Sequence, residues 1–306
     1  SVQFGVMYGL LSPDRLTRVL DARHKVPAGQ EVLTVPEIFD AVQDTVFGGV
    51  ADVAQRKGTN QAPALSAIQR NLQREYVTLL PTRRADHRAL FWAFLFIPFQ
   101  YLWVGLEWYG LFIIWIPVYA FIFVPMRLVL VGETEGFLRS AGTIHWGLMS
   151  TVFAVSHVAF LLVLPESVNP HGGGAALVLF LVILTAAIDV AQYIWGKALG
   201  RKKALPTVSP GKTVGGLVGG VATTLLLAWL LAPVLTPLNM LQALCAGAII
   251  GLGGFIGDVV ISAVKRDIGV KDSGTLLPGH GGILDRLDSL TYTAPLFFHF
   301  LYYLYG

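Results

Sequence analysis

A run of acidic, basic and hydroxyl side chains near the C-terminal end of the chain has the residue types of a phosphate-handling site. Asp258, Ser262, Lys265 and Arg266 are spaced i, i+4, i+7 and i+8. If this stretch is helical, the four side chains share one face. Asp258 also falls inside the boundary of an apolar segment, where an ionisable side chain is a candidate functional residue. We expect this face to act at a membrane surface.

More aspartates and several glycines follow in the same region. Asp285 and Asp288 can point at one place if a helix begins after Gly282. Carboxylates bind Mg²⁺ together with substrate phosphates, and Lys or Arg neutralises the remaining phosphate charge. Glycines let the backbone approach an anion closely. The alternative is a solvated basic loop at a membrane surface, which explains the Lys and Arg residues but gives the aspartates no role.

A second polar block precedes the first along the chain. Asp189 and Tyr193 are spaced i and i+4 at the end of an apolar segment, and Ser209 and Lys212 follow on a loop able to grip a triphosphate. Two structural alternatives stay open here. Asp189 could be the partner of a buried cation, and Ser209 and Thr213 could cap the next helix.

The composition indicates how these residues are held. Hydrophobic residues make up 54% of the chain and charged residues 13%, about half the ~25% typical of soluble domains. The single cysteine excludes an internal disulfide and a cysteine-based metal site. We therefore predict an all-α, polytopic transmembrane protein with about seven spans. The expected segments are Leu90–Leu106, Tyr109–Val131, Gly147–Leu164, Gly174–Trp195, Val214–Leu235, Met240–Ile261 and Leu290–Tyr305.

Two regions of different composition meet near residue 88. Residues 1–88 are mostly polar, and we expect a small, mostly helical cytoplasmic arm with helices near 35–47 and 63–80. The arm contains no catalytic motif and is expected to pack on or steer the membrane domain, residues 89–306. A separate soluble domain is a weaker alternative at this length. The chain begins at Ser1 without a signal-peptide pattern.

The positive charges predict an orientation. With the arm in the cytoplasm, all 22 Lys and Arg residues lie on the cytoplasmic side, and the outside loops near 107–108, 165–173 and 236–239 contain none. We therefore expect an integral protein of a bacterial inner membrane, with its polar site facing the cytoplasm.

The order of the polar residues resembles a known family. The pattern Ser-x-x-Lys-Arg-x4-Lys-Asp, followed by Pro-Gly-His-Gly-Gly-x-x-Asp-Arg-x-Asp, spans residues 262–288 and is similar to the signature of the phosphatidate cytidylyltransferases. The Asp189-x-x-x-Tyr193-x-x-Gly196 stretch and the Ser-Pro-x-Lys-Thr loop, residues 209–213, resemble the same family. We expect the similarity to extend from about Phe91 to Gly306 and to exclude the arm.

The resemblance implies the reaction of CTP with phosphatidate to give CDP-diacylglycerol and pyrophosphate. It implies Mg²⁺ as cofactor, with two ions as one option, and CTP, phosphatidate and the bilayer as partners, without nucleic acid. A homodimer stays open. The implied catalytic residues are Asp258, Ser262, Lys265, Arg266, Lys271, Asp272, His280, Asp285, Arg286 and Asp288. The implied substrate-binding residues are Asp189, Tyr193, Ser209, Lys212 and Thr213. The implied metal ligands are Asp258, Asp285, Asp272 and Asp288.

Two departures from the family pattern keep alternatives open. The family commonly has Glu where this chain has Gly215, and Glu where it has Ile261. These losses fit a divergent paralogue, with a changed lipid or nucleotide preference or one fewer metal contact. One alternative is another nucleotidyl or phosphoryl transfer to a lipid phosphate or lipid alcohol, such as a polyprenol. The other is a non-catalytic lipid-binding or transport protein on the same scaffold.

Overall fold

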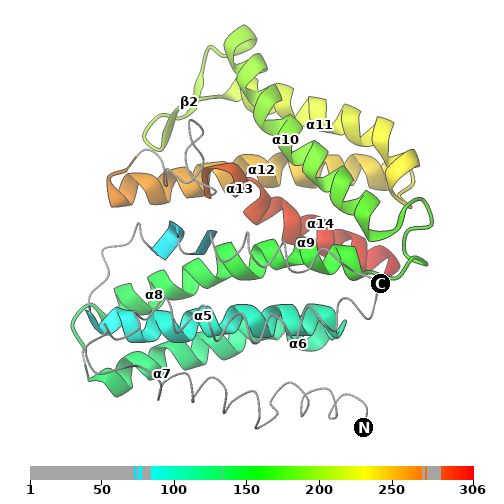
Figure 1. The fold of residues 1–306 in the computed structure, drawn as a ribbon. Coiled ribbons are helices and arrows are strands. Elements are labelled where there is room, and N and C mark those ends of the chain that lie inside the picture. The colour runs from blue at the N-terminus through cyan, green and yellow to red at the C-terminus, as the bar shows by residue number, and fades with distance from the viewer. Residues whose placement is uncertain (1–71, 74, 78–83, 133, 271–272, 274–283) are drawn as a thin grey trace, which may run out of the picture. The chain divides into compact units, whose positions relative to one another are not determined.

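The computed structural model describes residues 72–73, 75–77, 84–132, 134–270, 273 and 284–306, and nearly all of them are helical (Figure 1). The chain divides into two compact units. The first contains residues 1–66 and 83–144, and the second contains residues 67–82 and 145–306. The polar residues singled out above all fall in the second unit.

The first unit consists of apolar helices joined by short turns. An aromatic cluster links α5 to the π-helix η1, because the Trp115 ring lies 5.3 Å from Phe96 and 5.4 Å from Phe99. Gly132, with φ of 85°, ends α7 in the left-handed conformation that glycine adopts readily. The elements are α5 (Arg84–Gly105), α6 (Tyr109–Ile114), the π-helix η1 (Trp115–Ala120), α7 (Phe121–Val131) and α8 (Phe137–Gly147), whose last three residues belong to the second unit.

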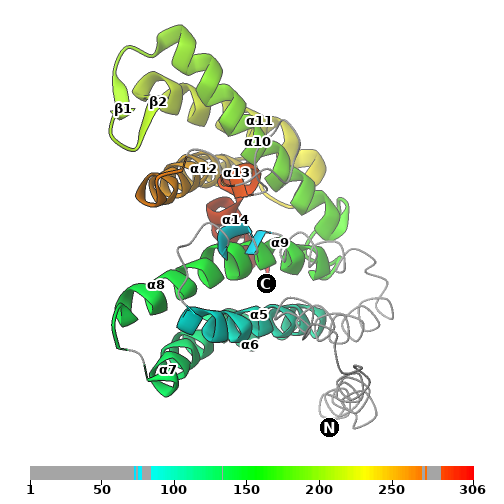
Figure 2. The same cartoon turned by 60° about the vertical axis from the view of Figure 1, so that its left-hand side comes forward.

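The second unit is a bundle in which α10 packs on α11, α11 on α12, α12 on α14, and α14 on α9 (Figures 1 and 2). A short hairpin connects α10 to α11. The elements are η2 (Leu148–Phe153), α9 (Ala154–Val163), α10 (Gly173–Leu199), β1 (Lys203–Leu205), β2 (Ser209–Thr213), α11 (Val214–Leu235), α12 (Met240–Ile268), α13 (Leu284–Leu287) and α14 (Leu290–Tyr305). This bundle positions the site.

Glycines let the helices of the second unit approach at backbone distance. A Cβ at Gly216 would lie 2.6 Å from the Gln192 carbonyl oxygen, where α11 crosses α10. A Cβ at Gly257 would lie 2.5 Å from the Asp288 carbonyl oxygen, where α12 meets the turn before α14. Small residues permit such close packing in membrane helices. The second contact places Asp258 beside the Asp288–Ser289 turn.

The all-α, polytopic class is confirmed, whereas seven spans are not. Within the part of the chain that the structure describes, five helices are long and apolar enough to cross a bilayer by length and composition. The first expected segment corresponds to α5, in which the described side chains include the shorter apolar stretch Trp92–Gly105, and the last corresponds to α14, which has 16 residues. The five helices are Tyr109–Leu130, Phe137–Val163, Gly173–Leu199, Val214–Leu235 and Met240–Ile268.

Three helices extend further into the expected loops than their apolar residues indicated. One expected span begins ten residues earlier, at Phe137, and α10 and α12 continue to Leu199 and Ile268. A helix can continue through charged residues once it has left the lipid, because their side chains then reach water. Lys265 and Arg266 lie in the last turn of α12, where cations are favourable, and Gly269 ends the helix with φ of 81°.

A two-stranded antiparallel hairpin occupies the loop expected between α10 and α11. Lys203 pairs with Thr213, and Leu205 pairs with Ser209. The hairpin is a small addition to the predicted all-α class. Lys212 lies in the second strand, so the hairpin positions its side chain.

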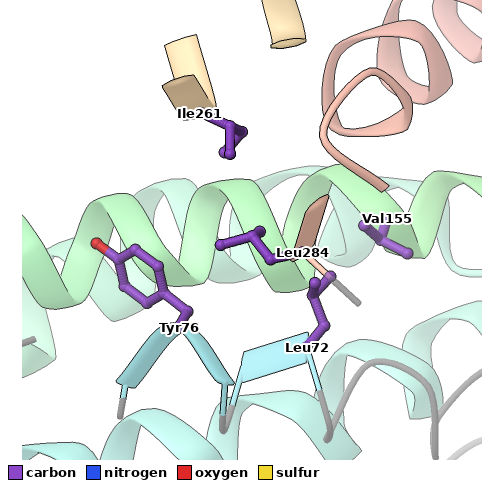
Figure 3. Packing of buried hydrophobic residues seen from close by; sticks show 5 residues of the cluster. All are labelled: Leu72, Tyr76, Val155, Ile261 and Leu284. Atoms are coloured by element: carbon purple, nitrogen blue, oxygen red, sulfur yellow. The ribbon is translucent and has the colours of Figure 1, made fainter. Parts of the chain in front are cut away.

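Only part of the predicted arm falls within the described residues. The helix expected at 35–47 lies outside them. Of the helix expected at 63–80, residues 72–73 and 75–77 are described and helical. Leu72 and Tyr76, one helical turn apart, are both buried, and they pack with Val155, Ile261 and Leu284 (Figure 3).

Candidate active site

Lys212 connects three elements of the second unit through its ammonium group. It lies near the end of β2 and forms an ion pair with Asp258 of α12. It also donates a hydrogen bond of 2.8 Å to Gln192 Oε1 of α10 and lies 5.1 Å from the Phe255 ring centroid. Ser262, one turn after Asp258 on the same helix, donates to Asp258 Oδ1 at 3.3 Å. These contacts form the first polar group of the site.

A second polar group surrounds Asp285. Lys265 Nζ donates to Asp285 Oδ1 at 2.7 Å, and both side chains are largely buried. The other carboxylate oxygen, Oδ2, accepts hydrogen bonds from the Ser273 backbone N–H at 2.8 Å and from Ser273 Oγ at 2.9 Å. Asp285 is therefore held on both oxygens.

The Asp288–Ser289 turn lies between these groups. Asp288 Oδ1 accepts from the Ser289 backbone N–H at 2.7 Å, and Ser289 Oγ donates to Asp189 Oδ1 of α10 at 3.0 Å. Burial raises the pKa of Asp288 to about 7, and the negative charges of Asp258 and Asp189 contribute. The Ser289 N–H and the Lys265 ammonium oppose this shift. Asp288 thus links the two groups electrostatically.

The described residues do not gather into a preformed metal site. No set of three or more His, Cys, Asp or Glu side chains among them could hold a metal ion. Instead, Asp258 contacts Lys212 and Asp285 contacts Lys265. The predicted ligands present here therefore do not fit a metal centre in this arrangement, and Asp272 lies outside the described residues. The requirement for Mg²⁺ stays a prediction.

Several predicted site residues lie apart from these contacts. Tyr193 is exposed, and the Lys197 ammonium lies 4.4 Å from its ring centroid. Thr213 caps α11 by accepting from the Gly216 backbone N–H at 3.0 Å, as the capping alternative predicted. Ser209 pairs with Leu205 in the hairpin.

The remaining predicted residues are exposed or not described. Arg266 and Arg286 are exposed on α12 and α13. Lys271, Asp272 and His280 lie outside the described residues. The structure therefore brings seven predicted residues into two polar groups and the Asp288–Ser289 turn, which interact electrostatically through Asp288: Asp189, Lys212, Asp258, Ser262, Lys265, Asp285 and Asp288.

The two departures from the family pattern have a local structural reason. A Cβ at Gly215 would lie 2.9 Å from the Leu199 carbonyl oxygen, so a larger side chain would push α10 and α11 apart. Ile261 is fully buried in the apolar cluster of Figure 3. A carboxylate at that position would need a polar partner to offset its burial.

Sequence reasoning missed four residues that contact the site. Gln192 lies three residues after Asp189 on one helix face, and Ser289 directly follows Asp288, so local spacing could have indicated both. Ser273 and Glu75 carry no such signal. Glu75 Oε1 accepts a hydrogen bond from Ser273 Oγ, 198 residues away in the chain. It also accepts one of 3.1 Å from the Leu284 backbone N–H.

Comparisons with known proteins cover most of the chain. The sequence profile of the cytidylyltransferase family matches residues 56–304. The resemblance therefore begins within the predicted arm, and the expected start near Phe91 was wrong. An uncharacterized protein of Escherichia coli, YnbB, is 54% identical over 230 residues, which is 75% of both chains.

Relatives with an assigned name match a shorter stretch. The phosphatidate cytidylyltransferase of Synechocystis sp. is 48% identical over 119 residues, 38% of this chain and 39% of that protein. The phosphatidate cytidylyltransferase of Bacillus subtilis is 39% identical over 132 residues, 43% of this chain and 48% of that protein. The chain thus matches less than half the length of these two relatives.

Proposed function

The chain belongs to the cytidylyltransferase family, and from this premise we propose that it transfers the cytidylyl group of CTP to phosphatidate. The products would be CDP-diacylglycerol and pyrophosphate. The observation that carries the proposal is the pair of contacts Lys212–Asp258 and Lys265–Asp285, joined electrostatically through Asp288. Ammonium groups form charge-assisted hydrogen bonds with phosphate oxygens, so the two lysines suit a polyphosphate. The names of the Synechocystis and Bacillus relatives support the same reaction.

The chemistry requires positioning more than proton transfer. A phosphate oxygen of the lipid attacks the α-phosphorus of CTP and forms a new P–O bond. The bond between the α-phosphorus and the oxygen that bridges to the β-phosphorus breaks, and pyrophosphate leaves. The nucleophile is already an anion, so no strong general base is needed. Lys212 and Lys265 would bind the phosphates and offset their charge. Gln192 and Asp285 would hold these two ammonium groups in place.

The membrane setting extends the proposal to the lipid substrate. The five helices of bilayer length among the described residues support an integral membrane protein. We propose an inner-membrane location with the site facing the cytoplasm, because all 22 basic residues fall on one side of the predicted topology. CTP would then bind from the cytoplasm, and the lipid phosphate would approach along the membrane surface.

The test is a turnover assay on the purified full-length protein with labelled CTP, Mg²⁺ and phosphatidate, followed by lipid analysis. Parallel reactions replace phosphatidate with a polyprenyl phosphate or diacylglycerol, replace CTP with ATP, or include a chelator. CDP-diacylglycerol formed only from CTP and phosphatidate supports the proposal. A nucleotidylated polyprenyl phosphate or a phosphorylated alcohol favours the related transferase. No turnover with any lipid favours the non-catalytic paralogue.

A further inference from the structure

Glu75 joins the predicted arm to the site. It lies on the short helical segment of residues 72–77 and is 8% exposed. Its Oε1 atom accepts hydrogen bonds from Ser273 Oγ and from the Leu284 backbone N–H. Ser273 and Leu284 are the described residues on either side of residues 274–283. One carboxylate oxygen therefore connects both ends of the stretch that contains the glycine-rich motif.

Ser273 connects Glu75 to Asp285 through hydrogen bonds. Its hydroxyl lies within hydrogen-bond distance of both Glu75 Oε1 and Asp285 Oδ2, and its backbone N–H donates to the same Asp285 oxygen. A hydroxyl has one hydrogen, which two carboxylates compete for or share. Asp285 in turn holds Lys265. Glu75, Ser273, Asp285 and Lys265 thus form a continuous chain of polar contacts.

Apolar packing explains how the segment reaches this position. Leu72 and Tyr76 flank Glu75 and pack against Ile261 and Leu284 (Figure 3). Ile261 lies one turn before Lys265 on α12, and Leu284 directly precedes Asp285. The segment is thereby attached to both elements that carry the Lys265–Asp285 pair. Apolar contacts alone would not favour a carboxylate here, because a buried charge costs free energy unless it is hydrogen-bonded.

We propose that Glu75 is a positioning residue of the active site, which sets the place of Asp285 and Lys265 through Ser273. The segment before the membrane helices is then part of the catalytic centre rather than an accessory extension. The catalytic half of this inference rests on the proposed function. The structural half, the contacts of Glu75 with Ser273 and Leu284, does not.

Hydrogen exchange on the full-length protein in detergent tests the structural half. The variants are Glu75→Ala, Glu75→Gln and, as a packing control, Val77→Ala, because Val77 packs on the same apolar cluster. Loss of one acceptor should speed exchange of the Leu284 amide about tenfold in Glu75→Ala. Glu75→Gln keeps an acceptor oxygen, and Val77→Ala keeps the carboxylate, so both should exchange at nearly the wild-type rate. Equal rates in Glu75→Ala and wild type would overturn the contact.

Kinetics of the same variants test the catalytic half. Glu75→Ala should lower kcat per folded molecule about tenfold or more, with Glu75→Gln partly restoring it, while Val77→Ala lowers only the melting temperature. Adding Ser273→Ala to Glu75→Ala should cause little further loss, because both act through one contact. If Glu75→Ala, like Val77→Ala, lowers only the melting temperature, the positioning role is overturned. If the wild type makes no CDP-diacylglycerol, the proposed function fails, and the exchange rates alone decide the Glu75 contact.

Discussion

Lys212 of the hairpin and Asp258 of α12 form an ion pair, and Gln192 of α10 accepts a second hydrogen bond from the same ammonium group. The Lys212 ammonium group therefore connects β2, α10 and α12. Neither charged residue can be neutralised without leaving the other with an unmatched charge. Mutations of this pair must separate a structural role from a role in binding phosphate or metal.

Asp258→Asn should abolish most activity and also destabilise the fold. The lost carboxylate leaves the Lys212 charge unmatched, but both side chains keep some solvent contact, at 15% and 25% exposed. The loss of stability should therefore be below the ~3–5 kcal/mol of a fully buried pair. The matched control is Asp267→Asn, an exposed aspartate on the same helix. Melting temperature in detergent and turnover of labelled CTP are the two measurements.

The double variant Lys212→Met/Asp258→Asn separates the two roles. It removes both charges, so stability should recover while activity stays at least about a hundredfold below wild type. Recovery of activity together with stability would show that the pair is only structural. A folded Asp258→Asn protein with normal specific activity would lead to the same conclusion, and the site would then rest on Asp285, Asp288 and Asp272.

Gly257→Ala should push α12 away from the turn that carries Asp288. The added Cβ would lie 2.5 Å from the Asp288 carbonyl oxygen and 3.1 Å from Ser289 Cα, and backbone atoms cannot rotate away. We expect a loss of about 1–3 kcal/mol in stability together with a loss of activity. Gly253→Ala is the control, because its Cβ meets the flexible end of Leu296 at 3.0 Å. Similar melting temperatures and activities for both variants would contradict the close packing.

The sequence predicts the parts of this structure that depend on local periodicity. An apolar run of bilayer length specified α11 at Val214–Leu235 to the residue, and helical spacing put Ser262 one turn after Asp258, where the two side chains are hydrogen-bonded. The ends of α10 and α12 were less predictable, because a helix continues beyond its apolar residues when polar side chains reach water. The family signature placed Asp285 and Asp288 in the site but did not identify their partners.

Contacts between distant segments could not be predicted. Glu75 lies in a stretch whose pattern indicates only an amphipathic helix, and its partner Ser273 is 198 residues away. Lys212 was expected to bind a triphosphate, but its pairing with Asp258 depends on how β2 meets α12. A single sequence holds no signal for such pairings, because they follow from packing rather than from spacing.

Stability should depend on pH through Asp288. Its pKa is raised from the ordinary value of 3.8 to about 7, chiefly by burial. Between these two values the unfolded chain binds fewer protons than the folded one, so stability falls as the pH rises and levels off above about 7. Asp288→Asn should flatten this slope and raise the melting temperature at pH 8 relative to wild type. The measurement is thermal unfolding in detergent with a chelator, and Asp267→Asn is the control. Identical slopes for wild type and Asp288→Asn would contradict the raised pKa.

Thiol labelling should show whether the site faces the cytoplasm. Cys245 is exposed and must first be replaced by Ser. In that background, Arg201→Cys should react only from the cytoplasmic side, and Ser167→Cys and Asn239→Cys only from outside, because the basic residues are expected to stay in the cytoplasm. All three positions are exposed, whereas the neighbouring Val168 is buried and would report poorly. Intact spheroplasts with a membrane-impermeant maleimide give the outside reaction, and permeabilised cells give the total. Labelling of Arg201→Cys in intact spheroplasts would overturn the orientation, and with it the binding of CTP from the cytoplasm.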